Sequence, residues 1–476
     1  MITANPINKD IFRSYDIRGK IGKEWCVNDN YHDAFLIGQS IGSQLINRGS
    51  PSVIVGRDGR LSSPNITDQL LKGLVSVGCL VTDLGIVATP VVYFALSHLH
   101  IKNGIMITGS HNPLDHNGIK IVYENTPLSK VVIETLYHDI VRNDFKSNNE
   151  GKLFQYSKII DDYQNAIVEN IQLSKPLRIA IDACNGVTSL FAESLFTRLG
   201  CEVHPLYCEL DGTFPNHSPD PTVPENLQAL TELVIKENLD IGLAFDGDGD
   251  RMIAVDNKGQ LLWPDRIMIL LANDVLKNNP SAPVVYDVKC SFLLSSSIRQ
   301  YGGQPSMCKS GHSILKLQML QLNAAMGGEF SGHIVMRDRW GDFDDGPYVA
   351  ARLLEVIANS EQTPEKVFNT IPDSYSTEEF KLPFEHPDLA VEVLNNFIRR
   401  SEFSGADLSL IDGLRVDYDD GWGLIRSSNT LACLTFRFEA VTIERLGEIQ
   451  EQFRFIFEQL NQERIENKKD ILTLPF

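Results

Sequence analysis

The feature that most constrains the fold is an order of segments that occurs three times along the 476-residue chain. Each round reads strand, helix, strand, helix, strand and then a polar loop. The rounds follow one another at intervals of roughly 110–140 residues, an ordinary size for a domain. They run from Ser52 to Thr108, from Leu177 to Phe245 and from Pro283 to Met326. Because the most unusual loop stands at the same place in each round, we expect the three loops to face one shared cleft.

The segments outside the rounds complete the predicted organisation. Residues 156–173 form an amphipathic helical stretch, and after about residue 372 the pattern changes to a strand at 431–440 and a helix at 443–460. We therefore predict an α/β chain of three similar mixed α/β domains and a smaller C-terminal α+β domain around a central cleft. The predicted domains are residues 1–153, 154–256, 257–371 and 372–476.

The net charge of the chain limits its partners. At −19, an acidic surface repels nucleic acid and anionic membranes, so we expect neither as a partner. The amino terminus lacks the basic start and apolar core of a signal peptide, and no apolar stretch is long enough to cross a bilayer. The eight cysteines contain no Cys-x-x-Cys pair, so we expect free thiols and a cytoplasmic protein.

The loop after the first round is Thr108-Gly-Ser-His-Asn-Pro113. It presents Ser110 at the carboxyl end of a strand, where open α/β sheets bind their ligands. Lys120 follows a few residues later and places a positively charged side chain near the same loop. A serine hydroxyl alone is a weak nucleophile, and on its own this loop is better explained as a simple turn that caps a strand.

The loop after the second round carries Asp246, Asp248 and Asp250, separated by glycines and followed by Arg251. Three carboxylates this close repel one another unless a cation lies between them, and hard oxygen ligands suit Mg²⁺. An EF-hand would need glycine and glutamate where Arg251 and Asn257 stand. A phosphatase with an aspartate nucleophile and a solvated acidic turn are the other interpretations.

Three further segments offer weaker signals. Gly327–His333 carries a carboxylate, a hydroxyl and an imidazole that could bind sugar hydroxyls, although capping and surface roles would also fit. Residues 426–430 collect a guanidinium, hydroxyls and an amide, which suits a phosphate clamp or a turn before a strand. Phe12–Gly19 holds an Arg-Tyr-Arg cluster that fits a phosphate site or an ordinary hairpin.

Together these five segments resemble the α-D-phosphohexomutase family, specifically its phosphomannomutase/phosphoglucomutase branch. The resemblance covers nearly the whole chain and keeps the order of the motifs. It implies an isomerase that interconverts the 1-phosphate and 6-phosphate of mannose, glucose or both. The reaction would pass through a phosphoserine enzyme and a hexose 1,6-bisphosphate, which also serves as activator, and Mg²⁺ would be the cofactor.

The resemblance also implies a role for individual residues. Ser110 would carry the phosphoryl group and, with Asp246, Asp248 and Asp250, contact the metal. Arg18 and Arg251 would surround the transferring group, and Lys120 and His333 are the candidates for general acid and base. The substrate would be bound by Tyr15, His111, Lys289, His312, Glu329, Ser331, Arg426, Ser428, Asn429 and Thr430.

Several alternatives stay open. A phosphoglucosamine mutase is disfavoured because that branch usually carries glutamine at the position of Phe330. A sugar-phosphate phosphatase and a non-catalytic phosphosugar-binding protein are the other candidates. The sequence fits mannose and glucose equally well, and we expect a monomer. Because the phosphate clamp must accept the sugar in both orientations, we predict a hinge near residues 368–374.

Overall fold

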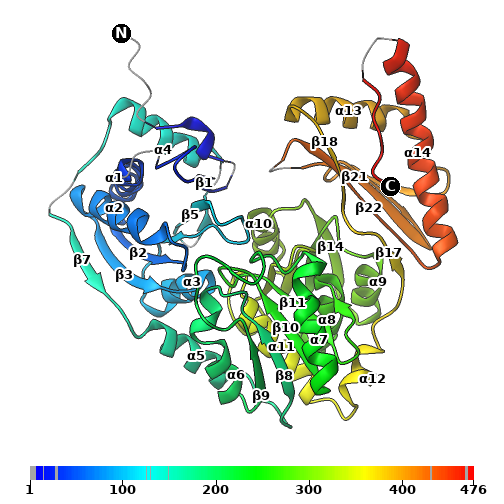
Figure 1. The fold of residues 1–476 in the computed structure, drawn as a ribbon, viewed down its shortest axis with the longest axis horizontal. Coiled ribbons are helices and arrows are strands. Elements are labelled where there is room, and N and C mark those ends of the chain that lie inside the picture. Colours follow the sequence, from blue (N-terminus) through cyan, green and yellow to red (C-terminus); the bar gives the residue numbers. More distant parts are fainter. Residues whose placement is uncertain are drawn as a thin grey trace. The chain divides into compact units, whose positions relative to one another are not determined.

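The computed structural model of the protein describes residues 7–13, 15–26, 30–124, 126–128, 130–147, 150–428, 431–466 and 470–476. The chain forms two compact units, and Figure 1 labels their helices and strands. The first contains Met1–Ile267 and Ser331–Phe368, and the second contains Met268–Phe330 and Asn369–Phe476. Within the described residues, none of the helices combines the length and hydrophobicity needed to cross a membrane.

The first round of the sequence pattern forms a seven-stranded sheet in the first unit, in the order β1-β5-β4-β2-β3-β7, with β6 paired to β5. Strands β4, β2, β3 and β7 run parallel, whereas β5 is antiparallel to both β4 and β1. The β-branched run of β2 is buried, as expected for a parallel strand covered on both faces. The strands are β1 (Ile17–Lys20), β2 (Ser52–Arg57), β3 (Leu80–Ile86), β4 (Gly104–Ile107), β5 (His116–Tyr123), β6 (Thr126–Pro127) and β7 (Lys152–Gln155).

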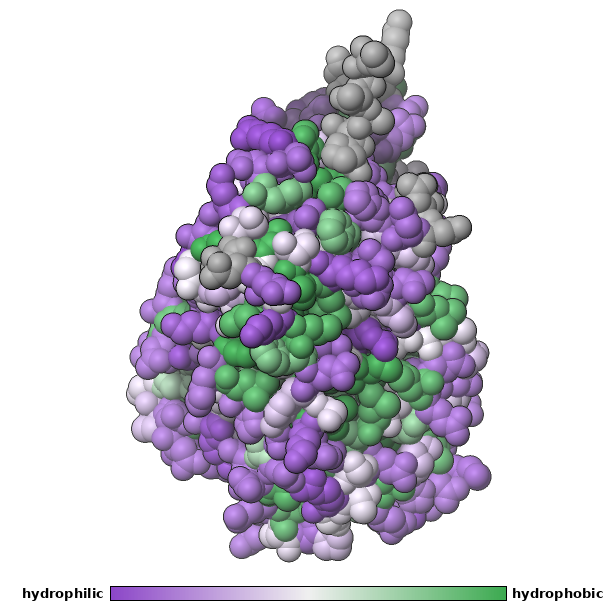
Figure 2. All heavy atoms as spheres, turned by 90° about the vertical axis from the view of Figure 1, so that its left-hand side faces the viewer, coloured by the Kyte–Doolittle hydropathy of each residue, from purple (hydrophilic) through white to green (hydrophobic). Residues whose placement is uncertain are grey.

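Helices cover this sheet, and two of them cross unusually closely. At the crossing of α1 and α2, a Cβ atom on Gly38 would lie 3.2 Å from the Cα of Gly73 and would meet the carbonyl of Leu70. Glycine is therefore required there by close approach of the two backbones. The edge strand β7 leaves Leu153 and Phe154 about half exposed, and Figure 2 shows hydrophobic patches among hydrophilic side chains on this side of the molecule. The helices are α1 (His32–Asn47), α2 (Ser63–Ser76), α3 (Thr89–His98) and α4 (Lys130–Arg142), with a short 3₁₀ turn at Lys9–Ile11.

The second round forms a five-stranded sheet in the same unit, in the order β12-β11-β10-β8-β9. Strand β8 is parallel to both β10 and β9, and β11 returns antiparallel to β10. The loop between β10 and β11 is the aspartate loop. The elements are α5 (Ile159–Asn170), β8 (Arg178–Asp182), α6 (Ala192–Arg198), β9 (Glu202–Leu206), α7 (Gln228–Glu237), β10 (Ile241–Phe245), β11 (Met252–Asp256) and β12 (Leu261–Leu262), with 3₁₀ turns at Val187–Leu190 and Pro224–Leu227. Farther along the chain, this unit also contains β16 (Ile334–Met336), α11 (Gly346–Ala358) and α12 (Pro364–Phe368).

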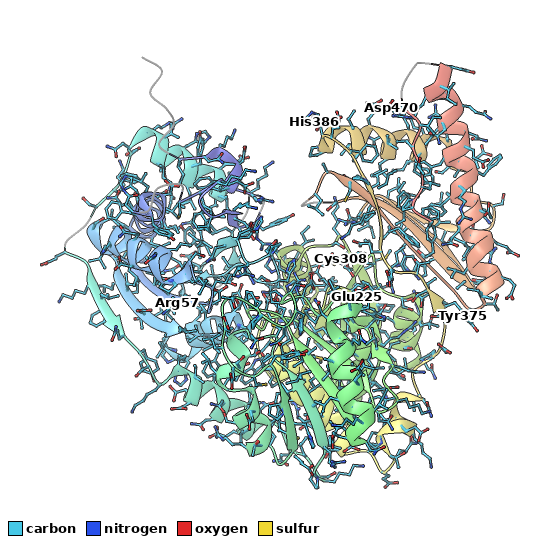
Figure 3. The ribbon with its side chains drawn as sticks, in the orientation of Figure 1. Arg57, Glu225, Cys308, Tyr375, His386 and Asp470 are labelled. Carbon is cyan, nitrogen blue, oxygen red and sulfur yellow. The ribbon has the colours of Figure 1, made fainter. Side chains whose placement is uncertain are left out.

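The third round lies in the second unit, where β13 is parallel to both β14 and β15. Arg57, which ends β2 in the first unit, and Cys308, which ends β14 in the second, are labelled in Figure 3. Helix α8 (Pro264–Asn278) leads from one unit into the other along the chain. The remaining elements of this round are β13 (Pro283–Asp287), α9 (Phe292–Gln300), β14 (Gln304–Cys308), α10 (His312–Leu322) and β15 (Met326–Gly328).

The C-terminal part of the second unit is an antiparallel sheet in the order β17-β22-β21-β20-β19, with β18 also paired to β22. One face of this sheet packs against α13 and α14 through a cluster of buried apolar side chains that includes Val416, Ile425 and Phe436. The elements are β17 (Tyr375–Ser376), β18 (Phe380–Pro383), α13 (Pro387–Arg400), β19 (Asp407–Ser409), β20 (Leu414–Tyr418), β21 (Gly421–Ser427), β22 (Cys433–Ala440) and α14 (Ile443–Glu466).

The mixed α/β fold class predicted from the sequence is confirmed, whereas the shared central cleft stays a prediction. The N-cap of α3 is Ala88, and the Thr89 hydroxyl donates a hydrogen bond to Asp248. Helices α6 and α7 each follow a 3₁₀ turn in the chain.

Candidate active site

The serine loop follows β4 and presents Ser110 inside the first unit. Ser110 is 2 % exposed and has a φ of +49°, a left-handed conformation that is strained for a residue with a side chain. Its backbone N–H donates to the Thr108 hydroxyl at 2.8 Å. Its own hydroxyl donates to Asp246 Oδ2 at 3.0 Å and lies 3.3 Å from His111 Nδ1. The sequence-predicted serine and aspartate loops therefore meet at this hydroxyl.

Arg60 supports the serine loop, and sequence reasoning missed it. Its guanidinium is almost fully buried and donates to the carbonyl oxygens of Ser110, Asn112, Pro113 and His116 at 2.6–3.1 Å. Asp58 accepts the Gly109 N–H and lies 3.3 Å from Arg60 Nε. The signal was present as Arg57-Asp-Gly-Arg60 at the end of β2, but a charged turn at the end of a strand usually indicates solvent exposure.

Asp246, Asp248 and Asp250 lie within the first unit with their oxygen atoms close enough to share one ion. All three are buried, and Asp248 Oδ1 has no hydrogen-bond partner among the described residues. Lys120 Nζ lies 2.7 Å from Asp248 Oδ2 and 2.5 Å from Asp250 Oδ2, and the Thr89 hydroxyl donates to Asp248 at 2.6 Å. Three convergent carboxylates with an unpaired oxygen fit a hard divalent cation.

The charges of this cluster shift the pKa values of its members in different directions. Burial and the like charges of Asp248 and Asp250 raise the pKa of Asp246 well above its ordinary range. Burial alone would also raise the pKa of Asp250, but the charges of Lys120 and His333 hold it well below its ordinary range. Burial alone would lower the pKa of Lys120, but Asp248 and Asp250 raise it. The three buried carboxylates can therefore all be ionised only when positive charge lies between them.

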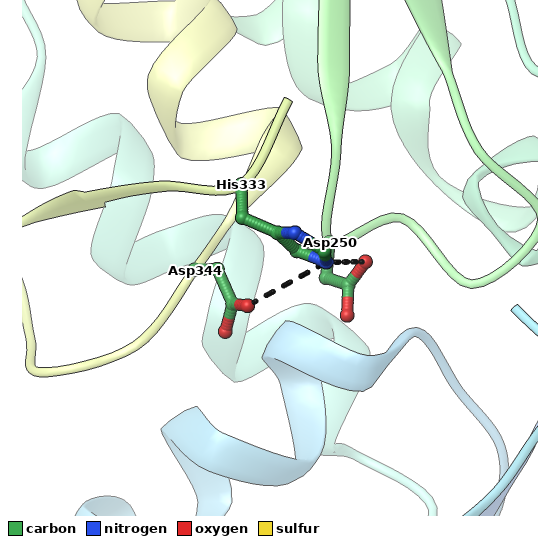
Figure 4. Close-up of side chains that lie close together, drawn as sticks. All are labelled: Asp250, His333 and Asp344. Atoms are coloured by element: carbon green, nitrogen blue, oxygen red, sulfur yellow. Dashed lines mark ion pairs between the residues drawn. The ribbon is translucent and has the colours of Figure 1, made fainter. Parts of the chain in front are cut away.

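His333 joins this cluster from Gly327–His333, the segment predicted to bind sugar hydroxyls and called the sugar loop below, as Figure 4 shows. Its Nε2 atom lies 3.3 Å from Asp250 Oδ1 and 3.9 Å from Asp344 Oδ2. Arg251 Nε lies 3.2 Å from the same nitrogen and 3.9 Å from Asp246 Oδ2. Ser331 Oγ lies 3.2 Å from His333 Nδ1. Asp344 was missed by sequence reasoning, because it reads as one acid in an acidic turn.

The amino-terminal motif reaches the same unit through β1. Arg18 pairs with Gly118 of β5 in the strand register and lies 2.6 Å from Asp16. Burial, together with the charges of Arg251 and Arg18, lowers the pKa of His111 well below its ordinary value. Tyr15 is half-buried and contributes no hydrogen bond to the cluster within the part of the chain that the structure describes.

The second unit holds the other predicted ligands. Glu329 is buried and accepts the Gly311 N–H at 2.6 Å, next to His312 at the first residue of α10. Lys289 lies 3.6 Å from Glu379. Asp287, which sequence reasoning missed, is fully buried and accepts the Phe330 N–H at 3.1 Å and the Ser310 hydroxyl at 2.5 Å.

The predicted phosphate clamp lies at the end of β21. Arg426 is 5 % exposed, and its Nε donates to Asp412 at 2.9 Å, while its Nη2 has no hydrogen-bond partner among the described residues. Asp412 also accepts the Ser310 N–H at 3.2 Å. The Ser428 hydroxyl accepts the Leu431 N–H. The predicted ligands Asn429 and Thr430 lie outside the described residues.

Models of four domains of one family match successive parts of the chain. The alpha/beta/alpha domains I, II and III of phosphoglucomutase/phosphomannomutase match residues 9–147, 161–259 and 263–375. The C-terminal domain of the same family matches residues 378–455.

Individual relatives are similar over nearly their whole length. The phosphomannomutase/phosphoglucomutase of Pseudomonas aeruginosa is 45% identical over 95% of this chain and 96% of its own. The phosphoglucomutase of Neisseria meningitidis serogroup A is 42% identical over 95% and 97%. A crystal structure of a phosphoglucomutase/phosphomannomutase family protein from Burkholderia thailandensis superposes with a TM-score of 0.91 at 41% identity, over 99% of this chain and 100% of its own. With four family domains matched in order and such relatives along its length, the chain belongs to the phosphoglucomutase/phosphomannomutase family of α-D-phosphohexomutases.

Proposed function

We propose that this protein is a phosphohexomutase that interconverts the 1-phosphate and 6-phosphate of glucose and mannose. The observation that carries the proposal is the buried Ser110 hydroxyl, 3.0 Å from Asp246 in a group of three convergent carboxylates. The names of the relatives include both sugars, which supports a dual specificity.

In the proposed reaction, Ser110 in its phosphorylated form gives its phosphoryl group to the free hydroxyl of the hexose monophosphate. The bond from phosphorus to Ser110 Oγ breaks, a bond to the sugar oxygen forms, and the sugar hydroxyl loses its proton. The resulting hexose 1,6-bisphosphate then reverses its orientation in the site and returns its other phosphoryl group to Ser110. Arg18 and Arg251 neutralise the charge of the transferring group, and we assign Lys120 and His333 to hold and move the proton.

We propose Mg²⁺ as the cation, held by Asp246, Asp248, Asp250 and the phosphate of Ser110. When bound, it supplies positive charge that stabilises the transferring phosphoryl group. A fungal N-acetylphosphoglucosamine mutase of the same fold has been crystallised with magnesium. We expect added Mg²⁺ to raise the melting temperature. At a Mg²⁺ concentration one hundred times the dissociation constant, the free energy of unfolding should rise by about 2.7 kcal/mol. Asp248→Asn should remove this increase, and calorimetry with and without a chelator measures it.

The remaining predicted ligands complete the proposal. Glu329 and Ser331 would bind ring hydroxyls, and Arg426 and Ser428 the non-reacting phosphate. The Nη2 atom of Arg426, which has no hydrogen-bond partner among the described residues, suits a phosphate oxygen. We also propose that the substrate is bound by Tyr15, His111, Lys289, His312, Asn429 and Thr430. We further propose the domain boundaries given above and a monomeric protein. All eight cysteines lie within the described residues and are free thiols, which supports a reducing, cytoplasmic location.

The experiment replaces Ser110 with alanine. Purified wild-type protein, activated with glucose 1,6-bisphosphate, is assayed on glucose 1-phosphate, mannose 1-phosphate and glucosamine 1-phosphate. We expect turnover of the first two, and intact-protein mass spectrometry should find one phosphate on the chain. Ser110→Ala should lose both the phosphate and the turnover, whereas Ser97→Ala, at an exposed serine of α3, should keep both. Undiminished turnover in Ser110→Ala would refute the carrier role.

The same assay separates the alternatives. Release of inorganic phosphate without isomerised sugar would favour a phosphatase. Binding without either product would favour a non-catalytic phosphosugar-binding protein, and preference for glucosamine 1-phosphate would favour a phosphoglucosamine mutase.

A further inference from the structure

The C-terminal sheet of the second unit has one face that is charged although it is buried. Arg415, Leu424 and Arg437 stand opposite one another across β20, β21 and β22, and Asp417, Trp422 and Glu439 form the next row. Side chains alternate between the faces of a strand, so these two rows lie opposite the apolar face that packs on α13 and α14. Arg437 is 2 % exposed and Glu439 is fully buried.

This charged face packs on one short segment, residues 288–291, which carries the predicted substrate ligand Lys289. Trp422 and Leu424 form a small core with Val288. The Arg415 guanidinium lies over Trp422 and donates to the carbonyls of Val288 and Cys290. The Ser291 hydroxyl donates to Glu439 at 2.8 Å. Burial of these charges is stable because each has polar or aromatic partners.

Arg437 differs from Arg415 in what it touches. Its guanidinium lies 3.6 Å from the centre of the Phe330 ring, a close cation–π contact with the sugar loop. It also donates a hydrogen bond to the carbonyl of Lys289. Phe330 follows Glu329 directly, and its own N–H is held by Asp287. One buried side chain of the C-terminal domain therefore contacts both the backbone of Lys289 and the sugar loop.

We propose that Arg437 is a positioning residue for hexose binding. By stacking on Phe330 it fixes the sugar loop, and with it the Glu329 carboxylate, in the orientation that receives the ring hydroxyls. The inference rests on the proposed function for its kinetic consequence, but the contact itself is independent of it. A side chain that served only to hold the C-terminal sheet against residues 288–291 would not need an aromatic ring at position 330.

The test is a double-mutant cycle of Arg437→Met and Phe330→Met. Methionine keeps apolar bulk at both positions but removes the charge or the ring face. We expect each single substitution to raise KM for glucose 1-phosphate between about threefold and thirtyfold, the range of ordinary cation–π contacts, with kcat changed less. In the Phe330→Met background, Arg437→Met should raise KM by less than about twofold. Equal effects of Arg437→Met in both backgrounds would overturn the proposal.

Two further measurements separate this inference from the proposed function. Hydrogen exchange of residues 327–333 in the free protein needs no activity, and it should become faster in Arg437→Met and in Phe330→Met. Arg415→Met removes a comparably buried arginine that stacks on Trp422 instead, and it should leave that exchange unchanged. If wild-type protein shows no mutase turnover, the proposed function fails. Faster exchange in Arg437→Met would still support the contact, because that measurement does not depend on activity. Unchanged exchange in Arg437→Met would refute the inference even in an active enzyme.

Discussion

At the scale of single residues, Arg60 is the most consequential side chain that the sequence did not predict. A lysine has one ammonium point charge in place of a flat guanidinium with five donors, so it cannot reach four carbonyls at once. We expect Arg60→Lys to lower the free energy of unfolding by about 2–4 kcal/mol, because buried acceptors lose their partners. We also expect kcat to fall by at least about tenfold, as Ser110 loses its orientation. Denaturant unfolding and mutase assays measure both.

Arg57→Lys is the matched control for this substitution. Arg57 ends the same strand but is only half-buried, and its hydrogen bond to the carbonyl of Asp58 is long at 3.4 Å. A similar loss of kcat in both variants would mean that positive charge in this region, rather than the Arg60 contacts, maintains the loop.

A pH effect is expected at His217, outside the candidate active site. Its Nε2 lies 3.1 Å from the buried carboxylate of Asp182. Burial alone would lower the pKa of His217, but the hydrogen bond and charge of Asp182 raise it above its ordinary value of 6.5. The protonated form is thus favoured by folding, so its stabilising contribution is complete below about pH 6.5 and is lost as the pH rises through the folded-state pKa.

The measurement compares wild-type protein with His217→Gln in denaturant unfolding from pH 5.5 to 9. The stability difference between them should be largest at the acid end and should shrink as the pH rises. A difference that is constant across this range would contradict the prediction.

At the scale of elements, the crossing of α1 and α2 depends on two facing glycines. A Cβ atom on Gly73 would meet the Phe35 carbonyl and lie 3.0 Å from the Cα of Gly38. We expect Gly73→Ala to lower the free energy of unfolding by about 1–3 kcal/mol, because the helices must move apart. In contrast, Gly447→Ala in α14 should be neutral or stabilising by up to about 1 kcal/mol, because no atom of the described residues lies within 4 Å of the added Cβ. Thermal unfolding of the two variants tests the pair.

Elements also show what the sequence could and could not predict. Strands such as Ile241–Phe245 and loops such as 246–251 were predictable, because short apolar runs and glycine-separated acids are local patterns. Thr89 and Asp287 were not, since each acts through a residue far away in sequence. A buried arginine or aspartate looks like a surface charge until the partners that neutralise it are known.

At the scale of the whole molecule, the second unit consists of two chain segments, so the chain passes between the units three times: at 267–268, 330–331 and 368–369. The last passage adjoins the predicted hinge, which stays a prediction. The first lies within α8, where bending would break helical hydrogen bonds. We therefore expect glucose 1-phosphate to change hydrogen exchange near residues 330–331 and 368–374 but not in α8. Equal protection with and without the sugar would contradict a hinge.

The position of Lys120 between Asp248 and Asp250 has a consequence for how the protein matures. Because an ammonium group already balances these acids, a nascent chain can close its sheets before it encounters any ion. Binding of the proposed Mg²⁺ would then exchange one cation for another, and it would free the lysine for the incoming sugar phosphate. The chain could therefore fold without the ion, and the ion would then stabilise the sheets that have already formed.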